Sequence, residues 1–431
     1  MRVTFGLLVL FASQLQAQQP AAPRCAAHDP YCVELRKIVQ NVRVQRAMTH
    51  IEQTDAAAVR ELITLTQIAA PPFKEAERGR KYAELLRAAG ADTVYTDAVG
   101  NVVAVRRGTS RGRVVVLGGH MDTVFPEETD VRVKQRGDTL FAPGIGDNTR
   151  GLIAMLQVLR GMVQANIRTQ ADLWFVGTVG EEGLGDLRGV KHLFRSGGPR
   201  IDSFIAVDGS SDEEITNAGV GSKRYRVTFN GEGGHSFGDF GAASPIHALG
   251  RAIHVFDEGA RRFAAANTGT TYNIGRINGG TSVNSIAFHA WMEVDMRSDN
   301  KQRLDAIDSI FHVSMVRALN EQNAARSRGP ELTLEARLVG DRPTGTTAAN
   351  SPLVQRAITV TRYFGLTPKL DESSTDANVP IARGIPAITI GRGGESGNSH
   401  APEEYWINAQ GTRGIRRILL VALAEAGFPS R

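Results

Sequence analysis

Imidazole and carboxylate side chains stand next to short apolar segments at several places along the chain. Those that follow such a segment directly, or after a short loop, are His120, Asp122, Glu181, Glu182, Asp208 and His400. Asp147 stands just before another apolar segment, which the pattern predicts to be a buried helix. Mixed nitrogen and oxygen donors of this kind suit a first-row divalent metal, zinc above all. The sequence therefore favours metal chemistry if the fold brings these side chains together.

The apolar segments themselves are typical of buried strands. Residues 102–105, 114–117, 173–179 and 204–207 are short apolar runs, and helical patterns alternate with them. This alternation predicts an α/β fold with a mostly parallel sheet and helices on both faces. Ligands bind at the carboxyl ends of strands in such sheets, so we expect the candidate residues to meet at one edge.

Each candidate residue alone also has a structural explanation. A single histidine after a strand is often only hydrogen-bonded, and adjacent glutamates such as Glu181-Glu182 usually lie in a solvated loop. Here the two glutamates end a strand that contains Leu173, Trp174 and Phe175. Unpaired carboxylates at the end of a buried strand are costly, and divalent cations would neutralise them.

A different pattern interrupts the α/β alternation between residues 213 and 345. Strands with alternating polarity and two helices follow one another in the order β-α-β-β-α-β. This order is typical of a ferredoxin-like sandwich. The α/β pattern resumes after residue 351, so the sequence predicts a small α+β domain inserted into the larger one.

The order of the motifs resembles the M20 family of metallopeptidases, the group that includes carboxypeptidase G2, peptidase T and aminoacylase-1. The matching features are His120-x-Asp122-Thr123, Gly-x-Gly-Asp147-Asn148, Glu181-Glu182-Gly183, Asp208, an inserted sandwich domain and a late His400. The resemblance covers roughly residues 55–425, and the motifs in this order are much more specific than any one of them.

The resemblance implies two zinc ions held by five side chains. Asp147 would bridge the ions, His120 and Asp208 would complete one site, and Glu182 and His400 would complete the other. Cobalt or manganese would suit the same donors.

Two further carboxylates would act in catalysis. The resemblance makes Glu181 the general base, which takes a proton from the attacking water and passes it to the leaving amine. It makes Asp122 the hydrogen-bonding partner that fixes the imidazole of His120.

The inserted domain would act as a lid and dimerisation domain. Its His235 resembles a histidine that stabilises the tetrahedral intermediate, in some dimeric members from the neighbouring subunit. Asn284 and Arg297 resemble substrate-binding residues, and a guanidinium suits a substrate carboxylate. Alternatively, His235 is a turn residue in a glycine-rich loop and Arg297 a solvated strand position.

Three functions are compatible with these residues. The first is a zinc-dependent exopeptidase that acts on short peptides with a free terminus. The second is an N-acyl amino acid deacylase with the same metal chemistry, since both reactions cleave an amide beside a carboxylate. The third is a peptide-binding protein without turnover, against which the intact Glu181 argues.

Composition limits the partners and the compartment. The 431 residues carry a net charge of only +5 without a basic tract, which gives no support to nucleic-acid binding, and no later apolar run is long enough to span a membrane. The N-terminus predicts a cleaved signal peptide, because Arg2 is followed by the apolar residues 3–12 and by a small residue, Ala17. The protein would then be secreted or periplasmic. The alternative is a buried N-terminal helix or a membrane anchor. Cys25 and Cys32 would form one local disulfide or remain two thiols.

The sequence thus divides into five segments. They are a signal peptide (1–17), an N-terminal tail (18–54), a first catalytic part (55–212), an inserted lid and dimerisation domain (213–345) and a second catalytic part (346–431). An open sheet in the insert would favour a homodimer through that domain.

Overall fold

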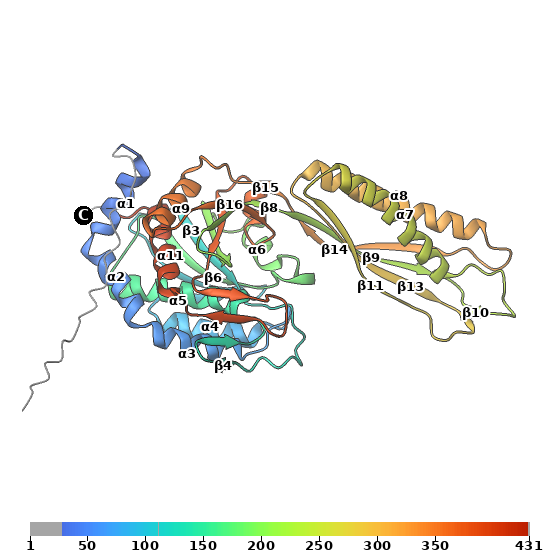
Figure 1. Cartoon of the computed structure of the whole chain (residues 1–431), viewed down its shortest axis with the longest axis horizontal. Coiled ribbons are helices and arrows are strands. Elements are labelled where there is room, and N and C mark those ends of the chain that lie inside the picture. The colour runs from blue at the N-terminus through green and yellow to red at the C-terminus, as the bar shows by residue number, and fades with distance from the viewer. Residues whose placement is uncertain (1–27, 111, 430–431) are drawn as a thin grey trace, which may run out of the picture.

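The computed structural model describes residues 28–110 and 112–429. It shows a large α/β domain from which an elongated second domain projects (Figure 1). Two long strands, β9 (Gly221–Asn230) and β14 (Thr333–Arg342), lead into and out of the second domain. Among the described residues, no helix is long and apolar enough to cross a bilayer.

The large domain is built on a nine-stranded mixed sheet whose four central strands are parallel neighbours. The central strands, in sheet order, are β6 (Asp172–Thr178), β3 (Val114–His120), β7 (Ser203–Gly209) and β17 (Ala387–Gly391). The outer strands are β1 (Thr93–Thr96), β2 (Val102–Arg106), β8 (Glu214–Gly219), β15 (Gly345–Thr346) and β16 (Lys369–Ser373). The expected α/β class, with a mainly parallel central sheet, is confirmed.

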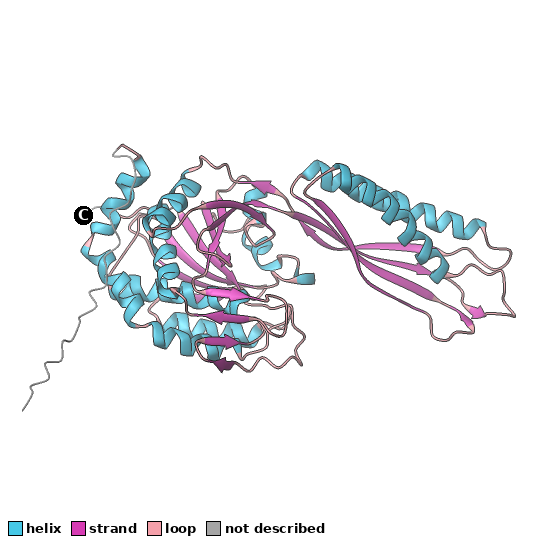
Figure 2. Ribbon diagram, viewed as in Figure 1, coloured by secondary structure: helices cyan, strands magenta, loops and turns pink. Residues whose placement is uncertain are grey.

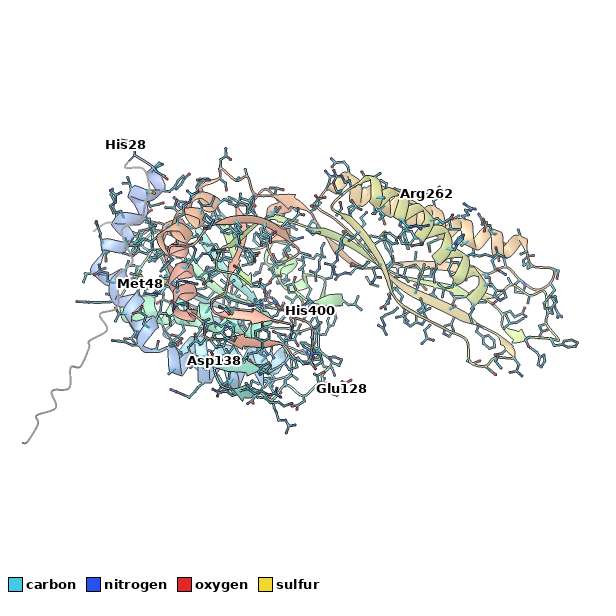
Figure 3. The ribbon with its side chains drawn as sticks, viewed as in Figure 1. His28, Met48, Glu128, Asp138, Arg262 and His400 are labelled. Carbon is cyan, nitrogen blue, oxygen red and sulfur yellow. The ribbon has the colours of Figure 1, made fainter. Side chains whose placement is uncertain are left out.

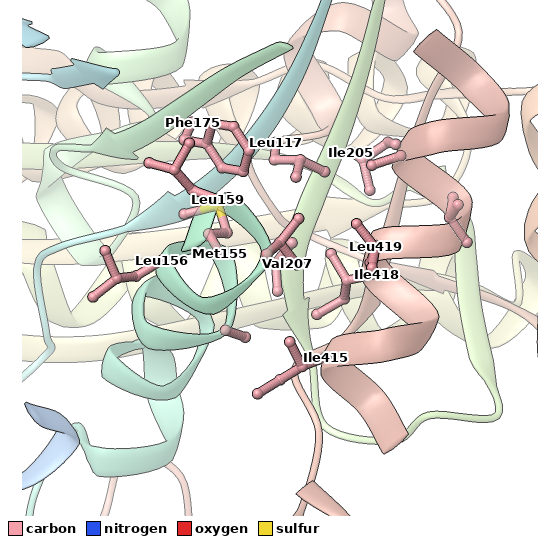
Figure 4. Close-up of a cluster of buried hydrophobic side chains, with 14 of the residues drawn as sticks. Leu117, Met155, Leu156, Leu159, Phe175, Ile205, Val207, Ile415, Ile418 and Leu419 are labelled. Carbon is pink, nitrogen blue, oxygen red and sulfur yellow. The ribbon is translucent and has the colours of Figure 1, made fainter. Parts of the chain in front are cut away.

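Both faces of this sheet are covered, which explains its continuous apolar strands. Leu117 faces α5 (Gly151–Gln164) and α11 (Gly411–Ala426) in the main core, and Figure 4 shows this packing. The neighbouring Val116 belongs to a second core on the opposite face. The helices of that side are α6 (Arg188–Leu193) and α10 (Asn378–Ala382), whereas α3 (Asp55–Thr66), α4 (Ala76–Ala88) and α9 (Pro352–Tyr363) pack with the main core.

The predicted N-terminal tail is wrong for residues 30–53. These residues form α1 (Pro30–Gln40) and α2 (Val42–Gln53), which pack on the catalytic domain. Val44 and Ile51 are fully buried in the main core. The apolar residues recur at helical spacing and so cover one face, which α5 and α11 complete. Cys32 is buried in α1, and Cys25 lies outside the described residues, as does the predicted signal peptide.

The inserted domain has the expected β-α-β-β-α-β order, and its two long helices lie on one face of a four-stranded sheet (Figure 2). The sheet order is β11 (Thr270–Gly279), β13 (His289–Ser298), β9 and β14. The helices are α7 (Pro245–Ala266) and α8 (Lys301–Ala324), and a two-stranded pair, β10 (Gly234–His235) and β12 (Ser285–Ile286), lies apart from this sheet.

The insert is shorter than the predicted 213–345. Strand β8 hydrogen-bonds to β17 and β15 in the large sheet, so the insert begins at β9 and ends with β14. A small second sheet, in the order β18-β19-β5-β4, completes the catalytic domain; its strands are β18 (Glu395–Gly397), β19 (Tyr405–Ile407), β5 (Thr139–Phe141) and β4 (Lys134–Arg136).

Candidate metal and active site

The carboxyl ends of the four central strands form the floor of the site. His120 is the last residue of β3, Asp208 lies near the end of β7, and the loop after β6 carries Glu181 and Glu182. Asp147 lies in the kinked segment Ile145–Arg150 that precedes α5, and its own backbone is not helical. Strands far apart in the sequence thus present their terminal side chains at one edge of the sheet.

The first cluster consists of His120, Asp147 and Asp208. Nε2 of His120 is 3.1 Å from Oδ1 of Asp147 and 3.5 Å from Oδ1 of Asp208. One donor atom from each of the three side chains lies within 4.8 Å of the others. This spacing is small enough for one cation to contact all three side chains.

The second cluster consists of Asp147, Glu182 and His400. Nε2 of His400 is 3.0 Å from Oε1 of Glu182 and 3.5 Å from Oδ2 of Asp147. His400 comes from the loop after β18 and is half-exposed, on the side of the catalytic domain that faces the insert (Figure 3). Asp147 therefore belongs to both clusters and presents a different oxygen to each.

The pKa shifts of the cluster residues indicate that the crowded carboxylates require positive charge nearby. Burial raises the pKa of Glu182 to about 7. Hydrogen bonds to Asp147 and Glu182 raise the pKa of His400 to about 10. Burial alone would lower the pKa of His120, but Asp208 and Asp147 outweigh it and hold that pKa well above its ordinary range. Without a metal, protons must offset the crowded carboxylates, and a divalent cation would replace those protons. The donor set therefore fits a pair of such cations.

Asp122 lies at the site but makes different contacts from those predicted. Its carboxylate is 3.8 Å from Nδ1 of His120, whereas its backbone carbonyl oxygen is 3.0 Å from the same nitrogen. The carboxylate instead accepts the backbone N–H groups of Glu181 and Glu182 at 3.0 and 2.8 Å. Asp122 therefore fixes the two glutamates with its side chain and His120 with its backbone.

An arginine that we did not predict positions Glu181. Arg342, at the end of β14, donates from Nη1 to Oε1 of Glu181 at 3.0 Å and from Nη2 to the Glu181 backbone carbonyl. It also donates to Oγ of Ser374 at 3.1 Å. The side chain is buried. Its only sequence signal is its place at the return from the insert, just before Pro343.

Two more buried residues hold the clusters. The Glu404 carboxylate accepts the backbone N–H groups of Gly144, Gly146 and Asp147, each at 2.8 Å. Nη1 of Arg392 donates to the carboxylate of Asp208 at 3.1 Å and is 3.4 Å from Oδ1 of Asp147. Neither residue belongs to a motif that marked it in the sequence.

Asp376 lies just before α10, in the segment Ser373-Ser374-Thr375-Asp376. It is buried and accepts a hydrogen bond from the hydroxyl of Thr178. Burial raises the pKa of Asp376 to about 8, and the nearby Glu181 adds to the effect. Asp376 therefore lies close enough to Glu181 for the two carboxyl groups to interact electrostatically.

A polar cavity of about 500 Å³ opens above the clusters. Arg224, Arg297 and Arg342 of the insert line it together with catalytic-domain residues. His235 and Asn284 do not line it. His235 lies in β10, at the far end of the insert, and Asn284 directly precedes β12, the strand that pairs with it (Figure 1). Within one chain the structure thus brings together every predicted site residue except these two.

Comparison with known families fits this geometry. The model of peptidase family M20/M25/M40 matches residues 116–424, which is most of the chain. The chain belongs to this family. M20 enzymes are hydrolases that use a divalent metal, and the two clusters supply the candidate ligands for it.

Curated relatives of this chain carry different names. YqjE of Bacillus subtilis is 26% identical over 78% of this chain and 90% of its own. A Pyrococcus abyssi protein named for hydrolysis of LysW-lysine and LysW-ornithine is 27% identical over 80% of this chain and 87% of its own. A succinyl-diaminopimelate desuccinylase of Leptothrix cholodnii is 29% identical over 44% of this chain and 53% of its own.

Solved structures share the fold. The aminopeptidase PepT of Bacillus cereus superposes with a TM-score of 0.65 at 22% identity, over 86% of this chain and 98% of its own. The dipeptidase Dug1p of Saccharomyces cerevisiae superposes with a TM-score of 0.70 at 13% identity, over 89% of this chain and 98% of its own.

Proposed function

We propose that this M20 protein is a zinc-dependent exopeptidase that removes a terminal residue from short peptides. The observation that carries the proposal is Asp147, whose two oxygens face two histidine–carboxylate clusters with Glu181 beside them. Two cations bridged by one carboxylate suit amide hydrolysis, because they can stabilise both the attacking and the leaving group. Cobalt and manganese are alternatives to zinc for the same donors.

Glu181 performs the proton transfer in this proposal. When bound, the metal pair supplies Lewis-acid polarisation of the amide carbonyl and lowers the pKa of water. Glu181 takes the proton of the attacking water and gives it to the amine that leaves. Arg342 holds the Glu181 carboxylate in place through Oε1, and Asp122 holds the backbone of Glu181.

Arg297 is the proposed anchor for a substrate carboxylate. It lines the cavity, and its Nε donates to Asp295 at 2.7 Å, which leaves the other side of its guanidinium available. Among the described residues, Val124 is the only aliphatic side chain that lines the cavity, which suits polar substrate groups near the proposed metal positions.

An N-acyl amino acid deacylase is the second candidate. The same residues would release an acyl group, and the relative named as a desuccinylase favours this alternative. Mass-spectrometric analysis of the products distinguishes the two candidate functions. The substrates are dipeptides, tripeptides and N-acetyl or N-succinyl amino acids, and each is tested once with added zinc and once with a chelator. Chelator-sensitive loss of a terminal residue supports the peptidase, release of acetate or succinate supports the deacylase, and no product from either set contradicts both.

Export and dimerisation are parts of the same proposal. His235 and Asn284 can contact substrate only if the insert moves or if a second copy supplies them. The insert sheet ends in the edge strands β11 and β14, which are available for pairing. Light scattering tests the homodimer, and N-terminal sequencing of the protein recovered from the periplasm or medium tests cleavage after Ala17.

A further inference from the structure

One wall of the active-site cavity carries two carboxylates that are not among the proposed metal ligands, Glu214 and Asp371. It is formed by β8 and β16, which run parallel with Asp371 opposite Thr216 and Lys369 opposite Glu214. Glu214, Thr216 and Asp371 all line the cavity. Alternate residues of a strand share one face, so Glu214 and Thr216 project from β8 on the same side.

Among the described residues, the side chains of Glu214, Thr216 and Asp371 have no hydrogen-bond or ion-pair partner, although Glu214 is near enough to Lys369 to raise the pKa of that lysine. The ammonium group of Lys369 is bound to Glu213 instead, at 3.0 Å. Thr216 is only 7% exposed, yet its hydroxyl lacks a hydrogen-bond partner in the described part of the chain. By contrast, Thr389, its neighbour on β17, is hydrogen-bonded to Thr375 at 2.7 Å. A buried polar group that faces a cavity without a partner points to a ligand.

We propose that Glu214, Thr216 and Asp371 form a subsite for a cationic group of the substrate. Two carboxylates and a hydroxyl offer acceptors to an ammonium or guanidinium, and together they select positive charge. The inference depends on the proposed function, because it names the substrate of the same cavity. With Arg297 in that cavity as the anchor for a carboxylate, the subsite fits a peptide that carries both charges.

The cation can come from a basic side chain or from the free N-terminus of a peptide. Binding to the zinc-loaded Glu181→Gln protein, measured by calorimetry, distinguishes these sources. The difference in affinity between glycyl-lysine and glycyl-norleucine tests whether a basic side chain is bound. The difference in affinity between glycyl-norleucine and its N-acetyl form tests whether the free N-terminus is bound. We expect at least one charged member to bind about tenfold more tightly, the scale of a charge-assisted hydrogen bond.

The preference must depend on the acidic wall. Glu214→Gln and Asp371→Asn, added singly and together, keep the shape of each side chain and remove its charge. We expect each to reduce the preference and the pair to abolish it. Glu372→Gln is the matched control, because Glu372 is an exposed acidic residue of the same strand that does not line the cavity.

Two results would overturn the subsite. One is equal binding of charged and neutral members of both pairs, and the other is a preference that survives the double substitution. Failure of the proposed function would look different, since it would appear as absent chelator-sensitive turnover in the wild-type protein, whatever the binding preference.

Discussion

Asp147 presents Oδ1 to His120 at 3.1 Å and Oδ2 to His400 at 3.5 Å. This division makes Asp147 the one side chain on which both proposed metal positions depend. We expect Asp147→Asn to lose both metal equivalents, because an amide offers one neutral oxygen in place of two charged ones. Metal analysis after gel filtration measures the loss. Asp138→Asn, an exposed change of the same kind, should keep both equivalents.

Metal binding should strengthen as pH rises through the neutral range. His400, with its pKa raised to about 10 in the metal-free protein, must lose a proton before it can bind a cation, and so must Glu182 below about pH 7. Calorimetry in buffers with different ionisation enthalpies should therefore show proton release at pH 7 and a higher affinity at pH 8 than at pH 6. An affinity that is equal at pH 6 and pH 8 would contradict this assignment of ligands.

Arg342 should affect turnover without affecting metal content. Arg342→Met removes both donors to Glu181, so we expect a loss of kcat of about tenfold to a hundredfold, the scale of a hydrogen bond to a charged group. Arg342→Lys should recover part of it. Arg337→Met, on the same strand but outside the cavity, is the control. Loss of metal in Arg342→Met would show that the arginine maintains the whole site instead.

The N-terminal helices should contribute to the stability of the catalytic domain. Ile51 of α2 is fully buried against α5, so Ile51→Ala should reduce the free energy of unfolding by about 2–5 kcal/mol. Val42→Ala, at a position that is 56% exposed, should change it by about 0.5 kcal/mol or less. Urea denaturation of the two variants measures the difference. Equal stability of both variants would mean that α2 packs only weakly on the domain.

The fold was predictable where apolar and polar residues recur at the regular spacing of a helix or a strand. Strand and helix alternation gave the central sheet, and the change to alternating polarity gave the insert. The strand β8 was missed as part of the large sheet because its pairing with β17 is antiparallel and its partners lie far along the chain. The packing of α1 and α2 was missed because the segment is mostly polar and contains proline. Its sequence shows an apolar face on each helix, but it does not show that α5 and α11 pack against that face.

The site was predictable where a residue follows a strand or belongs to a motif. His120, Asp208 and the glutamate pair meet because their strands are parallel neighbours. Arg342, Arg392 and Glu404 were not predictable, because nothing local distinguishes a buried charged residue from an exposed one. The carboxylates that Arg342 and Arg392 bind, and the backbone N–H groups that Glu404 accepts, lie between 161 and 260 residues away along the chain.

The division of labour between the metal ligands and Glu181 is the central claim, and the zinc-loaded Glu181→Gln protein tests it most directly. Metal content and turnover should be measured on the same sample, with the peptide that the wild-type protein cleaves best. We predict two metal equivalents, as in the wild type, and turnover lower by a factor of about a hundred or more. Turnover near the wild-type rate with full metal content would contradict the assignment of Glu181 as the general base.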